Sequence, residues 1–351
     1  MRILRNTWVR TGMAVAGLGL MAGLLWWRGP DWELVLDAFR LVEWSWIAGA
    51  ILLNLASVVV RAMAWQTVTD QAMPDDAPDF QSTFSGFAIG LLANAVLPGR
   101  IGELARVAVV TRRMPRRSGA TATLLGTVFA HRVFDLIPAL LLIGYVLTTA
   151  RIPHWAITSL VVVAGLGVVL FVFAIVGARL RMKASLDELG AVRRLIAMAR
   201  RGLGVMRNPL AALVAILLQC LGWFFQLLAV YVAMRAFDIH EPLPAAAVVL
   251  LLMNVATIFP LWPGNVGLLQ AAVALPLVSY GVAYPRGFAF GLGLQVLEMS
   301  VGVGVGLIFL AREGLSFATL RGMDAGDEHE LEQVVETALE REPVGAGNRF
   351  R

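Results

Sequence analysis

The residues with the most potential for chemistry lie in one segment, Asn94–Arg106, which has the sequence NAVLPGRIGELAR. Strongly apolar residues flank it, yet it holds an asparagine, two arginines, a glutamate, two glycines and a proline. Pro98 and Gly99 are expected to end a helix, because proline has no N–H to donate and glycine adopts conformations that other residues avoid. Gly102 is then the predicted start of a second helix.

The charges in this segment allow two interpretations. Glu103 and Arg106 are spaced i, i+3 and lie on one face of the predicted helix. If the break lies at membrane depth, these residues and Arg100 must be buried in protein or line a wet cavity, and they are then suited to hold an anionic group. The alternative is a cytoplasmic loop between two helices that carries a surface ion pair.

The composition places these charges in a membrane protein. Of the 351 residues, 58% are hydrophobic and 15% charged, whereas soluble domains carry about 25% charged residues. Repeated apolar runs of roughly 20 residues predict an all-α polytopic membrane protein with six or more transmembrane helices. A single cysteine and four histidines without ligand spacing predict no metal or other cofactor. The net charge of +5 suits anionic membranes, and we expect no nucleic-acid partner.

The charge pattern predicts the orientation of the first part of the chain. Residues 1–10 carry three arginines before the apolar run 11–27, which indicates a retained anchor with a cytoplasmic N-terminus. Residues 28–43 carry four acidic residues and two arginines and are expected to form an outer loop. A span from about 44 to 68 contains Arg61, which either snorkels to the inner interface or faces a cavity.

The next segment is too short to cross the membrane comfortably. The apolar run 80–97 ends at the Pro-Gly break, and four arginines between residues 112 and 117 return the chain to the inner side. We therefore predict a re-entrant helix pair. The following span, 118–150, contains Arg132 and Asp135 at i, i+3, where they either contribute to a binding site or form a purely structural ion pair between helices.

The middle of the chain continues with a predicted span at 155–177. Residues 178–209 are rich in arginine and are expected to form an amphipathic loop on the inner surface. A further span at 210–234 carries three polar or amphipathic residues on roughly one face: Gln219, Trp223 and Gln226.

Two short apolar runs, 245–259 and 265–279, predict a second re-entrant pair. The final span, 287–311, contains Glu298, and its glycines at 287, 291, 302 and 306 allow close packing of helices. Residues 313–351 form an acidic tail that is expected to be cytoplasmic and partly disordered.

An internal similarity links the two short pairs. LPGRIGELAR at 97–106 aligns without gaps with WPGNVGLLQA at 262–271, and each copy follows a short apolar run that contains an asparagine, Asn94 or Asn254. The two breaks fall on opposite sides of the membrane in the predicted topology. This pattern is typical of an inverted repeat, whose halves would span roughly residues 44–150 and 210–312.

The repeat predicts where a ligand would bind. Half-helices that begin at Gly102 and Gly267 would present free N–H groups and positive dipole ends to an anionic group near the midplane. Arg100 and Arg106 would supply charge. The headgroup of a phospholipid or a polyprenyl phosphate fits such a site.

The motifs N-x-x-x-P-G-R-x-G-E-x-x-R at 94–106, R-x-x-x-W at 61–65, R-x-x-D at 132–135 and P-x-x-P-G-x-x-G at 260–267 carry a family resemblance. Over about residues 10–312 the chain resembles the flippase-like membrane domain of lysylphosphatidylglycerol synthases and its stand-alone relatives. The resemblance implies a bacterial or archaeal protein of the cytoplasmic (inner) membrane that moves a lipid between leaflets.

The resemblance also implies a set of site residues in this chain. Carried over by motif position, they are Arg61, Asn94, Pro98, Gly99, Arg100, Gly102, Glu103, Arg106, Arg132, Asp135, Pro263, Gly264 and Gly267. From their place in the repeat or span we add Asn254, Gln270 and Glu298. The chain departs from the family pattern with Asn265 for a glycine, and with Gln270 and His131 where glutamate is usual. We therefore expect hydrogen bonding, and no proton coupling, at Gln270 and His131.

We expect no enzyme activity, because about 40 residues after the membrane region are too few for the soluble aminoacyl-transferase domain of the synthases.

The favoured function is translocation of an anionic phospholipid, glycolipid or polyprenyl-phosphate lipid. The main alternative is a non-catalytic lipid-binding or scaffold subunit of an envelope-lipid pathway. A membrane-embedded enzyme with Glu103 or Glu298 as its base is a third possibility. Homo-oligomers and envelope-lipid biosynthesis enzymes are left open as partners.

Overall fold

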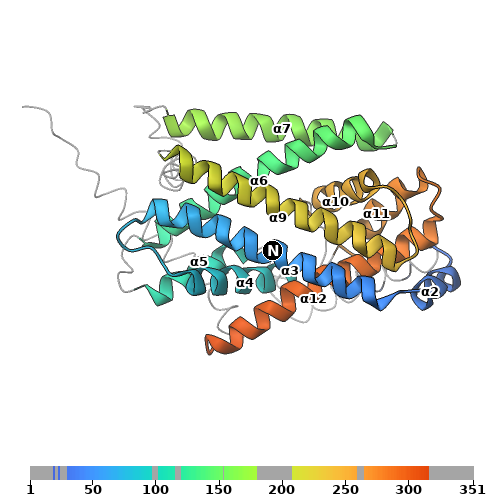
Figure 1. Cartoon of the computed structure of the whole chain (residues 1–351), viewed down its shortest axis with the longest axis horizontal. Coiled ribbons are helices and arrows are strands. Elements are labelled where there is room, and N and C mark those ends of the chain that lie inside the picture. Colours follow the sequence, from blue (N-terminus) through green and yellow to red (C-terminus); the bar gives the residue numbers. More distant parts are fainter. Residues whose placement is uncertain are drawn as a thin grey trace, which may run out of the picture.

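A computed structural model describes residues 30–96, 102–114, 120–152, 154–179, 208–258 and 265–315, together with Gly19 and Gly23. Its secondary structure over these residues is helical, as predicted (Figure 1). The described helices are α2 (Trp32–Arg40), α3 (Trp44–Ala72), α4 (Phe80–Val96), α5 (Gly102–Arg113), α6 (Ala120–Thr149), α7 (His154–Arg179), α9 (Pro209–Ala236), α10 (Leu243–Ile258), α11 (Leu268–Val278) and α12 (Tyr284–Arg312).

Among the residues that the structure describes, four helices are long and apolar enough to cross a membrane. They are α3, α9 and α12 over their full lengths and residues Thr123–Thr149 of α6. Helix α7 follows the predicted span at 155–177. The protein is thus a multi-pass membrane protein. Three predicted segments lie outside the described residues: the anchor at 11–27 apart from Gly19 and Gly23, nearly all of the inner-surface loop at 178–209, and the tail from residue 316.

The predicted outer loop at 28–43 proved to be partly helical. Asp31 caps helix α2 by accepting hydrogen bonds from the N–H groups of Glu33 and Leu34. Val35 and Ala38 on one face of α2 are buried in the main hydrophobic cluster. The charge count favoured a loop, whereas the N-cap and this apolar spacing stabilise a short amphipathic helix.

The two pairs of short helices occur where the sequence predicts them. At 1.5 Å per residue, the 17 residues of α4 and 12 of α5 extend about 26 and 18 Å, which is less than the ~30 Å hydrocarbon core. These two helices pack antiparallel, because Cβ atoms placed on Gly86 and Gly90 would lie 2.8 Å from the carbonyl oxygens of Arg106 and Gly102. Helices α10 and α11, with 16 and 11 residues, form the second pair.

Helix α12 packs against both pairs through its glycines, as predicted. A Cβ on Gly287 or Gly291 would lie 3.0 Å from a backbone Cα atom of α11. Gly302 and Gly306 face α4 instead, and a Cβ on Gly306 would lie 2.8 Å from the carbonyl oxygen of Ala88. Because these glycines have no side chain, the first half of α12 packs closely against α11 and its second half packs closely against α4.

A cluster of polar side chains fastens the end of α12 to the first pair. Two atom pairs of Arg113 and Glu313 are close, Nη2 to Oε1 at 2.7 Å and Nε to Oε2 at 2.9 Å. Ser85 donates to the same carboxylate, and Ser82 accepts from Arg113 at 3.3 Å. We call these four residues the Glu313 clamp.

Helices α3 and α9 lie antiparallel and side by side along their lengths (Figure 1). Three hydrogen bonds mark this pairing: Glu43 N–H to Ala236 O at 3.0 Å, Ser57 Oγ to Gly222 O at 2.8 Å, and Asn208 Nδ2 to Gln71 Oε1 at 3.4 Å. This pair forms the central wall against which α6 and α12 pack.

The order of helix lengths is the same in the two predicted halves. Helices α3 to α6 have 29, 17, 12 and 30 residues, and α9 to α12 have 28, 16, 11 and 29. In Figure 1 the long axis of the molecule is horizontal. The pair α4–α5 lies toward its left end and the pair α10–α11 toward its right end. An inverted repeat requires both features, and the repeat itself stays a prediction.

Candidate functional site

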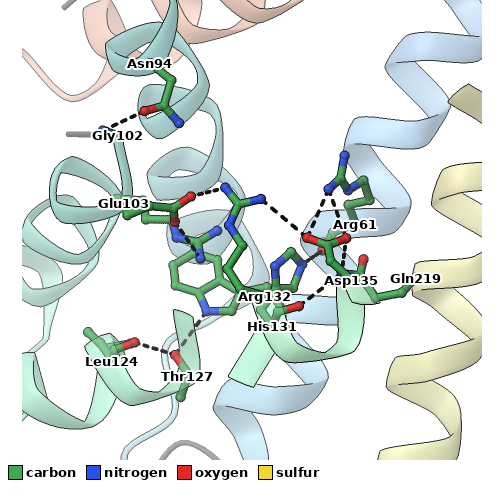
Figure 2. A network of polar contacts seen from close by, with 12 residues as sticks. Arg61, Asn94, Gly102, Glu103, Leu124, Thr127, His131, Arg132, Asp135 and Gln219 are labelled. Atoms are coloured by element: carbon green, nitrogen blue, oxygen red, sulfur yellow. Dashed lines mark hydrogen bonds and ion pairs between the residues drawn. The ribbon is translucent and has the colours of Figure 1, made fainter. Parts of the chain in front are cut away.

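A cluster of charged side chains lies where α3, α5, α6 and α9 meet (Figure 2). Asp135 stands near the middle of α6, 15 residues after its first residue and 14 before its last. About 20 Å of helix therefore extends on either side of it, which places Asp135 deep within a ~30 Å hydrocarbon core.

Asp135 is the centre of this cluster and receives donors from three helices. Arg61 Nη2 lies 3.1 and 3.2 Å from its two carboxylate oxygens. Gln219 Nε2 and Trp223 Nε1 donate to Oδ1 at 2.9 and 3.0 Å, and Arg132 Nη1 lies 3.4 Å from Oδ2. The predicted pair of Arg132 and Asp135 is thus present. Arg61 does not snorkel to the interface but pairs inside the protein, where several donors stabilise the negative charge.

Glu103 connects α5 to the same cluster. One of its carboxylate oxygens contacts Nη2 of Arg132, and the other lies 2.8 Å from Nη2 of Arg106. The predicted pair of Glu103 and Arg106 therefore forms, but it is not a surface pair, since Arg106 is only 3% exposed. The guanidinium carbon of Arg106 lies 4.6 Å from the ring centroid of Trp65 and 5.8 Å from that of Phe87, as in a cation–π contact.

Two neutral side chains fix the position of these charges. Trp65 is fully buried and donates from Nε1 to Thr127 Oγ1 at 3.0 Å, and this hydroxyl donates to the carbonyl of Leu124 at 2.7 Å. His131 Nε2 lies 3.2 Å from the backbone carbonyl of Arg61. A carbonyl can only accept, so Nε2 carries the proton. The predicted hydrogen-bonding role of His131 is therefore confirmed.

Gln219 and Trp223 were not among the predicted site residues, although both bond to Asp135. Their spacing with Gln226 on one face of an apolar span was the available signal. It could not reveal the partner, because Asp135 is more than 80 residues away in the sequence. Thr127 gave no such signal, since threonines in membrane helices commonly bond to their own backbone.

The sequence predicted free N–H groups at the start of each half-helix. This prediction was wrong for the first N–H group of each, at Gly102 and Gly267. The N–H of Gly102 donates to Asn94 Oδ1 at 2.9 Å, and that of Gly267 donates to Gln270 Oε1 at 2.5 Å. In each case a nearby side-chain amide caps the helix, because an unpaired N–H in an apolar environment is costly. Asn94 thus holds the first helix pair together across its break.

The predicted residues of the second half take different places. Glu298 on α12 hydrogen-bonds with Gln226 and interacts electrostatically with Arg61, so it faces the cluster. Gln270 is fully buried and donates to Gln295 at 2.6 Å, between α11 and α12. Asn254 Nδ2 donates to a carbonyl of its own helix at 2.8 Å. Five predicted residues lie outside the described part of the chain: Pro98, Gly99, Arg100, Pro263 and Gly264.

Among the described arginines of the cluster, Arg132 has the most exposed side chain. The side chain of Arg132 is 51% exposed, compared with 20% for Arg61 and 4% for Arg106. Its partner Glu103 is 27% exposed and Asp135 12%. An anionic group that reaches the cluster would therefore meet Arg132 first, and a guanidinium suits the oxygens of phosphate or carboxylate.

Sequence comparison shows the family of the chain. The family described as the lysylphosphatidylglycerol synthase TM region matches residues 14–306, which include every helix of the cluster. The chain belongs to this family.

Three archaeal relatives, each described as a UPF0104 membrane protein, are similar to the chain. A Pyrococcus horikoshii protein is 25% identical over 160 residues, which cover 46% of each chain. The chain therefore spans less than half of that relative. A Methanocaldococcus jannaschii protein is 23% identical over 57% of this chain and 84% of the relative. One from Methanothermobacter thermautotrophicus is 23% identical over 83% and 89%. No solved structure matches the chain.

Proposed function

We propose that this protein moves a lipid with an anionic headgroup between the leaflets of the bacterial cytoplasmic membrane. The observation that carries the proposal is the cluster of Arg61, Glu103, Arg106, Arg132 and Asp135 among long apolar helices. Charges at such depth are expensive and characteristically mark a substrate or ion pathway. The family description names a synthase of a phospholipid, lysylphosphatidylglycerol, which fits a lipid substrate.

In the proposed mechanism the headgroup binds at Arg132 while the acyl chains stay in the bilayer. The substrate is an anionic phospholipid, a glycolipid or a polyprenyl-phosphate lipid. The two halves of the repeat rock about the cluster and expose it to each leaflet in turn, as in other transporters built from inverted repeats. The N-terminus and the acidic tail lie in the cytoplasm, and no covalent step takes place.

A reconstitution experiment tests this function. The full-length protein in liposomes should accelerate the exchange of fluorescent phosphatidylglycerol between leaflets, followed by quenching with a reductant that does not cross the bilayer. Arg132→Gln should abolish most of this exchange. Arg286→Gln is the matched control, because Arg286 is 40% exposed and pairs with Asp238, outside the cluster. Full exchange by folded Arg132→Gln protein would refute the site.

The alternative is a lipid-binding or scaffold subunit without transport. It is favoured by the way Asp135 ties three helices together, which a purely structural ion network would also do. Deletion of residues 323–351 separates the two functions. A translocase should keep its transport rate without the tail, whereas a scaffold should lose its partner and show no transport before or after the deletion.

A further inference from the structure

The two carboxylates of the cluster are held very differently. Asp135 accepts from Arg61, Gln219, Trp223 and Arg132, and its side chain is 12% exposed. If any one of these four donors is lost, the other three still hold the carboxylate of Asp135. Asp135 is therefore a fixed part of the site.

Glu103 is the replaceable carboxylate. The structure shows two ion pairs for it among the described residues, one with each of Arg106 and Arg132. The pair with Arg106 is local, since both residues lie on α5 and are three positions apart. The pair with Arg132 joins α5 to α6 at the exposed edge of the cluster, where it occupies the guanidinium that an incoming anion would meet first.

We propose that Glu103 is a built-in competitor for the lipid headgroup. In the unloaded protein its carboxylate occupies Nη2 of Arg132. An anionic headgroup takes that position, while Glu103 stays paired with Arg106. When the headgroup leaves, Glu103 returns to Arg132. The inference rests on the proposed function and assigns a specificity-determining and release role to one residue of the site.

Charge balance explains why a transporter needs such a residue. Helices α3, α5 and α6 bring three arginines and two carboxylates to the cluster, and Glu298 reaches Arg61 from α12. Without Glu103 the excess positive charge would hold an anion tightly at low dielectric. Transport requires that the ligand can also leave. A carboxylate that takes back the guanidinium makes release an exchange of ion pairs, so that Nη2 of Arg132 is never left without an anionic partner.

The test measures binding and transport on the same variants. Purified full-length protein in detergent is titrated with short-chain phosphatidylglycerol by calorimetry, and transport is followed in liposomes. Glu103→Gln should bind about tenfold more tightly, equivalent to ~1.4 kcal/mol, and should transport more slowly because release is slowed. A merely structural role for Glu103 would instead weaken both binding and transport.

Two variants serve as controls. Glu313→Gln removes the same charge from the Glu313 clamp, and its affinity should stay within twofold of the wild type. Glu103→Asp keeps the charge but shortens the side chain, so its reach to Arg132 is reduced. It should bind more tightly by a smaller factor, and it provides the test if Glu103→Gln does not fold.

The outcomes separate this inference from the proposed function. Tighter binding by Glu103→Gln in a protein that shows no transport would support the competitor and overturn the translocase. Transport by the wild type with unchanged or weaker binding by both Glu103 variants would overturn the competitor and leave the translocase standing. Absence of phosphatidylglycerol binding by the wild type would overturn the competitor for this headgroup.

Discussion

The pairing of Arg61 with Asp135 permits a quantitative prediction. Asp135→Asn removes the negative charge that faces Arg61, whose guanidinium lies 3.1 and 3.2 Å from the two carboxylate oxygens. Removing one partner of a buried ion pair costs about 3–5 kcal/mol, because the other charge stays buried without compensation. Arg61 is 20% exposed and retains some solvation, so we expect about 3 kcal/mol, the lower end of this range.

A second substitution shows whether the loss comes from the unpaired charge. Arg61→Met alone leaves Asp135 with its donors from Gln219, Trp223 and Arg132, and should cost less than Asp135→Asn. In the double variant Arg61 no longer faces the neutral amide, and Arg132 keeps its ion pair with Glu103. The double variant should therefore be more stable than the sum of the single effects predicts, with a coupling energy of about 2 kcal/mol.

The free energies of unfolding are measured by denaturant titration of the purified proteins in mixed micelles, followed by tryptophan fluorescence. A double-mutant cycle whose effects add within about 0.5 kcal/mol would refute the argument. It would mean that Arg61 finds another partner or water when Asp135 is neutral. The cluster would then be less dry than its burial indicates.

Three further predictions concern packing and support of the site. Gly306→Ala should destabilise the protein by about 1–3 kcal/mol, because its Cβ would press on the backbone of α4, whereas Gly302→Ala, with its nearest atom at 3.7 Å, should be tolerated. Thr127→Val should cost about 1–3 kcal/mol, because it leaves the buried Nε1 of Trp65 without its acceptor, and unfolding of that variant measures the loss. Glu313→Gln should lower the unfolding temperature while lipid affinity stays the same; a large loss of affinity would show that the Glu313 clamp belongs to the site.

Hydropathy was sufficient to place the long apolar helices of the described part of the chain, although it missed α2. The runs predicted at 80–97 and 210–234 correspond to helices at Phe80–Val96 and Pro209–Ala236. Apolar length and a Pro-Gly break determine such elements locally. The predicted span at 44–68 is longer in the structure, because the helix continues to Ala72. In this last part of the helix, Gln66 Nε2 donates a hydrogen bond to Asp70 Oδ1, one turn further along the chain, at 2.5 Å. Hydropathy does not detect this polar side-chain bond.

Local ion pairs were also predictable, and long-range ones were not. Glu103 with Arg106 and Arg132 with Asp135 follow from the i, i+3 spacing on one helix. The contact between Arg61 and Asp135 depends on how α3 and α6 pack, and 74 residues separate the partners. The sequence therefore indicated which residues are charged at depth, but not that Asp135 collects donors from three helices.

Helix α12 offers a physical route between the two halves of the protein. Gly291 contacts α11, Gly306 contacts α4, and Glu298 lies between these glycines and interacts with Arg61. If α12 shifts against α3 and α6, the separation of Glu298 and Arg61 must change, because Arg61 on α3 is paired with Asp135 on α6. Tight glycine contacts favour a shift of α12 as a rigid body over bending at one end. The charge beside Arg61 would then depend on the position of α12, which contacts both helix pairs. The alternating access that we propose requires such a link between the two halves.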